Sequence, residues 1–214
     1  MANAPAPDGQ RTPGSRKGVQ TRARLIEAAR EVFERDGFLN ARISDITAAA
    51  NLSQGSFYHY FESKEQVFRE IAEAQERLLT EPGPATAGPR AELSPREVIG
   101  RANRRYFERY RDAAKLMGVI EQVSRYDDHV SAARFATMKH FAARAERSIR
   151  RLQRDGLADA TLDPQIAADA LGAMVARFAE IWMVEDYRDY EFEEAVEQLT
   201  RLWANALGIP ESAI

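Results

Sequence analysis

Residues 43–64 constrain this chain more than any other stretch, because they have the pattern of two short helices joined by a tight turn. Ser44 is placed to cap the first helix, Asn51 begins the break, and Ser53 is placed to cap the second helix. The apolar side of the first helix is supplied by Ile46, Ala49 and Ala50. This spacing is typical of a helix-turn-helix, whose second helix enters the DNA major groove.

The second helix carries side chains suited to contacts with DNA. A Gln side chain can read adenine through two hydrogen bonds, and Gly55 lets the backbone come close to the duplex. The alternative is an ordinary helical hairpin with surface aromatics, and spacing alone does not choose between the two. On the DNA interpretation, we expect base contacts from Gln54, Ser56 and Tyr58, and phosphate contacts from Thr21, Arg42, Ser53, His59, Tyr60 and Lys64.

Two segments carry a resemblance to a known family. The run L-S-Q-G-S-F-Y-H-Y-F-E-S-K-E, residues 52–65, resembles the recognition-helix signature of the TetR (tetracycline-repressor) family of bacterial regulators. The run T-R-A-R-L-I-E-A-A-R-E-V-F-E-R-D-G-F, residues 21–38, resembles the first helix of that family. The resemblance implies an all-α chain, with a three-helix DNA-binding domain followed by a helical domain for ligand binding and dimerisation. It also implies a homodimeric repressor that binds an inverted-repeat operator and is released by a small-molecule effector.

Charge and composition leave room for this function. The formal net charge is −3, so the chain has no global basic field, but Arg and Lys crowd residues 11–30, and local positive charge suffices for phosphate contact. Cysteine is absent, which excludes disulfides and cysteine metal sites. No apolar run is long enough to span a bilayer or form a signal peptide. We therefore expect a cytoplasmic protein with no membrane association.

Changes in composition divide the chain into three parts. Residues 1–18, rich in Pro and Gly, predict a disordered arm that either reaches DNA or stays clear of it. Residues 19–65 form the predicted DNA-binding domain, and a connecting helix continues to about Leu79, beginning with a Ser63–Gln66 capping box. Pro and Gly interrupt residues 81–93, and residues 80–214 form the predicted effector-binding and dimerisation domain.

The carboxy-terminal part predicts five helices, of which the second is short and apolar and the fourth is apolar over much of its circumference. Ser94-Pro95 and Asp163-Pro164 are helix starts, each combining an N-cap with a proline in the first turn. The expected buried stripes are Val98, Ala102, Tyr106 and Tyr110; Phe135, Met138, Ala142, Ala145, Ile149 and Leu152; and Phe192, Val196, Leu199, Leu202, Trp203 and Leu207. A second stripe on the long helix, Arg144, Arg147, Arg151 and Arg154, fits either an anionic ligand group or a solvated face.

The resemblance places the effector pocket inside the carboxy-terminal helices and the dimer interface on the last two. Methionines and aromatic rings suit a hydrophobic effector, because methionine adapts to irregular shapes. Ordinary core packing is the alternative for each of these side chains. The expected lining residues are Tyr106, Tyr110, Met117, Ile120, Phe135, Met138, Phe141, Met174, Phe178 and Trp182.

Two other classes of function were weighed. His59, His129 and His140 lack metal-ligand spacing, and no nucleophile or phosphate-loop motif occurs, so we expect no enzyme, no cofactor and no metal. Asp127 and Asp128 beside His129 could form an acid/base site, but a polar loop between helices explains them better. A nonspecific DNA binder is disfavoured by the mostly acidic carboxy-terminal half.

Overall fold

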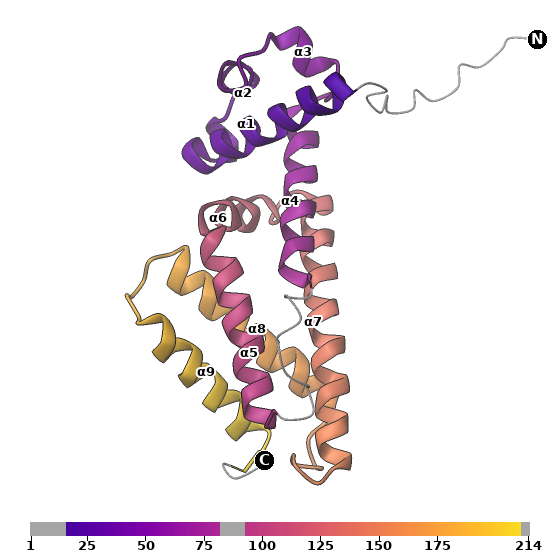
Figure 1. Cartoon of the computed structure of the whole chain (residues 1–214), viewed down its shortest axis with the longest axis vertical. Helices are drawn as coiled ribbons and strands as arrows, with labels where there is room; N and C mark the ends of the chain where they lie inside the picture. Colours follow the sequence, from indigo (N-terminus) through magenta and orange to yellow (C-terminus); the bar gives the residue numbers. More distant parts are fainter. Residues whose placement is uncertain (1–15, 82–92, 211–214) are drawn as a thin grey trace, which may run out of the picture. The chain divides into compact units, whose positions relative to one another are not determined.

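The computed structural model describes residues 16–81 and 93–210, and every regular element in these ranges is a helix (Figure 1). The predicted all-α fold class is confirmed. Predictions that fall on residues 1–15, 82–92 and 211–214 lie outside the described residues. The helices are α1 (Arg16–Asn40), α2 (Ile43–Ala49), α3 (Gln54–Tyr58), α4 (Lys64–Thr80), α5 (Pro95–Asp112), α6 (Ala114–Val123), α7 (Asp128–Arg154), α8 (Pro164–Met183) and α9 (Phe192–Ala206).

The chain divides into two compact units, and the division falls inside α4, between Ile71 and Ala72. The amino-terminal unit is built on the apolar face of α1, where Leu25, Ala29, Val32 and Phe33 are buried as the periodicity predicts. A cluster of aromatic rings extends this core: Phe33, Phe38 and Phe68 lie within 5.6 Å of one another, centroid to centroid. Burial of these rings is the main source of stability available to so small a unit.

The helical turns of α1 are interrupted at Gly37. Its φ of +73° lies in the left-handed region, which glycine adopts without the steric penalty of a side chain. The predicted end of the first helix is therefore confirmed, although a last helical turn follows to Asn40. Asn51, with a φ of +53°, turns the chain between α2 and α3 in the same way.

The two short helices form as predicted, with one error at the start of α2. Helix α2 begins at Ile43, so Ser44 already lies within its first turn and does not cap it. The N-cap position is held by Arg42, in extended conformation and without a side-chain cap hydrogen bond. Ala49, expected on the apolar side, is exposed. Ser53 does cap α3, because its hydroxyl accepts a hydrogen bond from the Ser56 N–H.

Predicted caps account for several of the other helix starts, whereas α6 and α9 begin without a side-chain cap. Ser94 and Glu97 form a complete capping box at α5, and Asp163 caps α8. Asp127 caps α7 by accepting the N–H groups of His129 and Val130, as a polar loop between helices would. At α4, Ser63 accepts the Gln66 N–H as expected, but the Gln66 side chain accepts from Glu62 rather than from Ser63.

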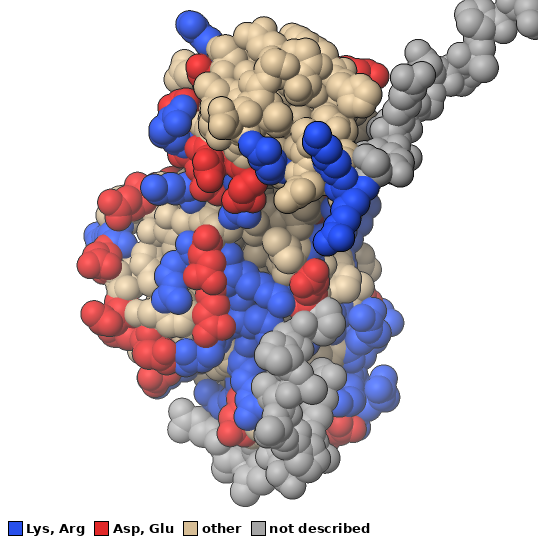
Figure 2. Space-filling model, turned by 45° about the horizontal axis from the view of Figure 1, so that its top comes forward, with Lys and Arg blue, Asp and Glu red and all other residues tan. Residues whose placement is uncertain are grey.

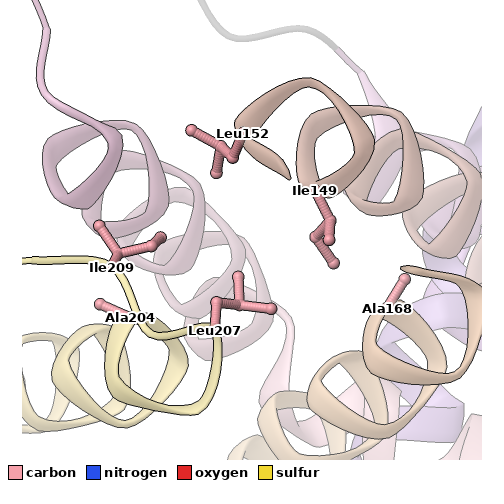
Figure 3. Close-up of a cluster of buried hydrophobic side chains, with 6 residues drawn as sticks. All are labelled: Ile149, Leu152, Ala168, Ala204, Leu207 and Ile209. Carbon is pink, nitrogen blue, oxygen red and sulfur yellow. The ribbon is translucent and has the colours of Figure 1, made fainter. Parts of the chain in front are cut away.

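The carboxy-terminal unit packs α7 against α8, and α5 against both α8 and α9. Figure 3 shows one of its apolar clusters, where side chains from α7, α8 and the end of α9 meet. The buried members are Ile149, Leu152, Ala168, Ala204, Leu207 and Ile209. This cluster fixes the lower end of the helical array as drawn in Figure 1.

Several of the predicted buried stripes are wrong in part. In α7, Phe135 is 57% exposed and Met138 46% exposed, whereas Thr137 between them is buried. In α5, Ala102 is exposed and the neighbouring Asn103 is buried, and Leu202 of α9 and Leu78 of α4 are exposed. These helices carry apolar residues on more than one face, and tertiary packing rather than the period decides which face is covered.

Candidate nucleic-acid interface and effector site

Helix α3 is held by buried aromatic rings on one side and is exposed to solvent on the other. Phe57 is fully buried and Phe61, just past the helix, is almost so, and their rings lie 5.6 Å apart beside the buried Ile46. The anchor leaves Gln54, at the first helical position, exposed to solvent. The two-helix arrangement therefore presents a fixed, short helix with one free face.

The residues predicted to read bases do not share one environment. Gln54 and Tyr58 are both exposed, and the Tyr58 ring is braced edge-on against Phe57. Ser56 is half-buried, and its hydroxyl lies 3.0 Å from the hydroxyl of Ser53. Ser53 and Ser56 thus hold the start of α3, while Gln54 and Tyr58 are free to face a ligand.

The other predicted phosphate-contacting residues come from α1, from the start of α2 and from the end of α3. His59 is exposed and Tyr60 half-exposed, with their rings edge to face at 4.8 Å. Arg42 is exposed at the start of α2. Thr21, half-exposed near the start of α1, donates its hydroxyl proton to the Lys17 carbonyl at 2.9 Å.

Two arginines near the start of α1 are used within the unit. Arg22 pairs with Glu70 and lies over the Phe61 ring, 4.9 Å from its centroid, and Arg24 donates to the Ala50 carbonyl. On the face seen in Figure 2, the upper part of the molecule has a broad uncharged area bordered by separate charged side chains. On this face, Lys and Arg side chains lie singly around the uncharged area and do not form a continuous basic patch.

Lys64 has an intramolecular role that its sequence position did not reveal. Its ammonium group donates to the carbonyls of Phe38, Leu39 and Ala41 at 2.8, 3.3 and 3.0 Å, and lies 4.7 Å from the centroid of the Phe38 ring. These carbonyls belong to the end of α1 and the connection to α2, where no further helical turn satisfies them. Lys64 therefore joins the first residue of α4 to the end of α1.

In the carboxy-terminal unit, the predicted pocket residues separate into packed and exposed groups. Tyr106 contacts both Tyr110 and Phe141, with ring centroids 5.8 and 5.7 Å apart. The rings of Phe178 and Trp182 contact each other at a tilt, and both contact Phe107, which sequence reasoning did not include. Met117 and Ile120 of α6 are buried, and Met174 is half-buried. Phe135 and Met138 stand on the exposed side of α7, so the structure does not bring them to these rings.

Three charged side chains lie near Tyr106, one buried and two partly buried, and sequence reasoning did not include them. Arg134 of α7 forms a two-pronged ion pair with Glu121 of α6, and donates to the Ser124 hydroxyl at 3.0 Å. Glu76 of α4 is buried, and its carboxylate lies 3.9 Å from the Arg134 Nε. The sequence did hold a signal, because Gln75 and Glu76 interrupt the apolar face of α4 between Ala72 and Leu79.

Burial perturbs the protonation of these groups. Loss of hydration raises the pKa of Glu76 and of Glu121. The Thr137 hydroxyl and then Arg134 partly oppose the rise at Glu76, and Arg134 partly opposes it at Glu121. Burial, and then the surrounding carboxylates, likewise raise the pKa of Tyr106; burial and the neighbouring Tyr106 raise that of Tyr110, so both phenols stay neutral. The Tyr110 hydroxyl is buried without a hydrogen-bond partner. The site thus places the rings of Tyr106 and Tyr110 beside polar groups whose charge or hydrogen bonding is only partly satisfied.

A separate groove of about 340 Å³ lies between α5 and α9. The Arg104–Glu193 ion pair crosses it, and its wall also includes Glu97, Arg101 and Glu197. None of the predicted pocket residues lines this groove. Its charges of both signs and its open form distinguish it from the buried aromatic site.

Within residues 16–81 and 93–210, no group of three or more His, Asp or Glu side chains is placed to hold a metal ion. The same ranges contain no helix long and apolar enough to cross a bilayer. The acid/base alternative at Asp127 loses its basis, because that carboxylate caps α7.

Comparison with known proteins matches the first unit most strongly. The sequence pattern described as "Bacterial regulatory proteins, tetR family" matches residues 25–71. The HTH-type transcriptional regulator YdgC of Bacillus subtilis (strain 168), whose function is uncharacterised, is 44% identical over 68 residues, which are 30% of this chain and 35% of YdgC. The HTH-type transcriptional regulator UidR of Escherichia coli (strain K12) is 42% identical over 60 residues, 28% of this chain and 31% of UidR.

These sequence matches span about a third of the length of each relative. The whole chain has a counterpart in fold: the structure of SmeT, the repressor of the Stenotrophomonas maltophilia multidrug efflux pump SmeDEF, superposes with a TM-score of 0.67. That match covers 90% of this chain and 92% of SmeT at 19% identity. At such low identity the likeness concerns the fold of the helical array.

Proposed function

We propose that the chain is a DNA-binding transcriptional repressor of the TetR family of bacterial regulatory proteins, because residues 25–71 of its amino-terminal unit match the pattern of that family. The observation that carries the proposal is the geometry of α3, whose buried Phe57 fixes the helix while Gln54 and Tyr58 remain exposed. Its relatives are regulators rather than enzymes, and we propose no catalytic activity. Action on chromosomal DNA implies a cytoplasmic location.

In this proposal α3 lies in the major groove. Gln54 is the principal base-reading residue, with Tyr58 and the less accessible Ser56 beside it. Phosphates are bound around the helix by Thr21, Arg42, Ser53, His59 and Tyr60. We assign Lys64 to the fold instead, because three carbonyls already surround its ammonium group.

We further propose a homodimer formed through α8 and α9. On α8, Ile166 is 70% exposed and shares one helical face with the exposed Ala170 and Ala173. On α9, Leu202 is 52% exposed. Small side chains allow close approach of a second helix, and exposed apolar groups gain from being covered. A twofold dimer would place two α3 helices on an inverted-repeat operator.

Ligand response completes the proposal. An effector releases DNA if it binds better to a conformation in which the two recognition helices do not fit their half-sites. The buried charged and aromatic site in the carboxy-terminal unit supports the presence of such an effector site, since uncompensated interior groups are uncommon without a function. Glu76 belongs to this site and lies on α4, the helix within which the two units meet in sequence.

The proposal is tested by fluorescence anisotropy with a duplex from upstream of the protein's own gene and a scrambled duplex of equal length. The assay is run at two salt concentrations, because phosphate contacts alone give a strongly salt-dependent affinity. We expect roughly a thousandfold preference for the native duplex at near-physiological salt. Equal affinity for both duplexes would point to nonspecific binding, and no binding at low salt would refute DNA recognition by α3.

A further inference from the structure

Glu76 is a buried carboxylate of the carboxy-terminal unit whose charge the Thr137 hydroxyl and Arg134 stabilise only in part. Its side chain is 5% exposed, and its carboxylate lies 3.9 Å from the Nε of Arg134. The two terminal nitrogens of the same guanidinium already pair with the carboxylate of Glu121. Two carboxylates therefore share one guanidinium. A carboxylate taken out of water without a full partner strongly favours any change that brings a positive charge to it.

A second observation points to the same place. The Tyr110 side chain is 2% exposed, and its hydroxyl has no hydrogen-bond partner. The hydroxyl lies in the field of Tyr106, Glu121, Glu180 and Arg134, so it belongs to the same polar centre. Buried hydroxyls normally find partners, and one that has none here is available to a ligand.

Aromatic surface surrounds this centre. The Tyr106 ring contacts both Tyr110 and Phe141. The charges of Glu76 and Glu121 help to raise the pKa of its hydroxyl. The faces of such rings attract cations and exclude water. An anionic ligand would meet two carboxylates, and a purely apolar ligand would leave the deficit of positive charge unchanged.

We propose that this site accepts the cationic group of an amphipathic ligand, an amine or quaternary ammonium attached to an apolar body, beside Glu76 and against the ring of Tyr106. The inference rests on the ligand response proposed above and specifies the chemistry of the effector. It also refines the expectation of a purely hydrophobic effector, because the carboxylates beside these rings have no favourable partner in an uncharged molecule.

Affinity for a permanent cation should depend on pH. The groups that face Glu76 or its partner are Tyr106 of α5, Glu121 of α6, Arg134 of α7 and Glu180 of α8. Because burial raises the pKa of Glu76, its carboxyl takes up a proton at a higher pH than an exposed glutamate does. Cation affinity should therefore fall as the pH is lowered, and the fall should begin at a higher pH than at a site built on an exposed glutamate, because protonation removes the attracting charge.

The test uses isothermal titration calorimetry of the full-length protein without DNA. The probes are benzyltrimethylammonium and its uncharged isostere 2,2-dimethylpropylbenzene, which differ in charge but hardly in shape. We expect the cation to bind about tenfold tighter than the isostere, and Glu76→Gln to lose about that factor. The matched control is Glu73→Gln, the same change at an exposed position of the same helix, which should leave the affinity unchanged.

Either of two results would overturn the inference: equal affinity for the two probes, or cation binding that Glu76→Gln does not weaken. Absence of saturable cation binding up to about 10 mM would do the same. Circular dichroism checks that each variant is folded, and the probe pair on the unmodified protein keeps the test independent of any variant. Anisotropy on the same preparations separates the two proposals, because loss of DNA preference counts against the regulator and not against the cation site.

Discussion

At the scale of single residues, the proposed complex assigns Gln54 and Arg42 two different kinds of DNA contact. Gln54 is exposed at the first position of α3, where an amide side chain can reach base edges. Arg42 is exposed at the start of α2 and carries a charge but no base-reading geometry. The first should determine which sequence is bound, and the second how strongly any duplex is bound.

We predict that Gln54→Ala costs roughly 1–3 kcal/mol of binding free energy on the native operator and little on a scrambled duplex. Arg42→Ala should weaken binding to both duplexes alike and reduce the slope of log affinity against log salt by about one unit. Anisotropy titrations at four or more salt concentrations measure both quantities. Equal loss of preference in the two variants would contradict this division of roles.

In the carboxy-terminal unit, residue type alone predicts only some members of the candidate effector site. Tyr106 and Tyr110 could be selected from the sequence because aromatic residues at helical spacing favour an interior. Glu76 could not be selected with the same reasoning, since a glutamate is usually solvated. Its significance depends on Arg134 and Glu121, which approach it from α7 and α6 and are far from it in sequence.

At the scale of elements, the sequence predicted most helix starts but only some of the buried faces. Caps depend on residues within one turn, so Ser53, Ser94 and Asp163 could be read directly from the sequence. The burial of a face depends on which other helix covers it. Hydrophobicity places Phe135 and Met138 on the buried face of α7, but in the structure Thr137 lies on that face. The Thr137 hydroxyl is 3.4 Å from the Glu76 carbonyl.

The link between α1 and α4 made by Lys64 is also a tertiary feature, and it can be tested by stability. Lys64→Met keeps the apolar stem but removes the charge that three carbonyls and the Phe38 ring surround. We expect the amino-terminal unit to lose roughly 2–3 kcal/mol of unfolding free energy, because hydrogen bonds to charged groups are strong and the carbonyls are left without that donor. Urea denaturation followed by circular dichroism and by hydrogen exchange in α1 measures the loss.

The control for this prediction is Lys17→Met, the same change at an exposed lysine of α1. It should leave the unfolding free energy within about 0.5 kcal/mol. DNA titrations add a second readout: if Lys64 acts only in the fold, the salt slope of folded Lys64→Met protein stays unchanged. A slope lower by about one unit would instead identify Lys64 as a phosphate contact.

At the scale of the whole molecule, the proposed regulator requires two copies of the chain. A single α3 offers one short helix with few exposed side chains, whereas two helices on one duplex combine their affinities. The surface offered for pairing is the face of α8 that carries Ile166, Ala170 and Ala173, together with Leu202 of α9.

We predict that Ala173→Arg separates the dimer while leaving each chain folded, because Ala173 is exposed in the single chain and an arginine there obstructs only a second copy. Light scattering after size-exclusion chromatography should show a halved mass, and affinity for the native duplex should fall roughly 100-fold or more as the two half-sites become independent. Ala136→Arg, the same change on the exposed side of α7, serves as the control and should remain dimeric. A dimer that survives Ala173→Arg with unchanged DNA affinity would exclude this face of α8 as the interface, because a buried arginine without a partner is too unfavourable to be accommodated in a close helix contact.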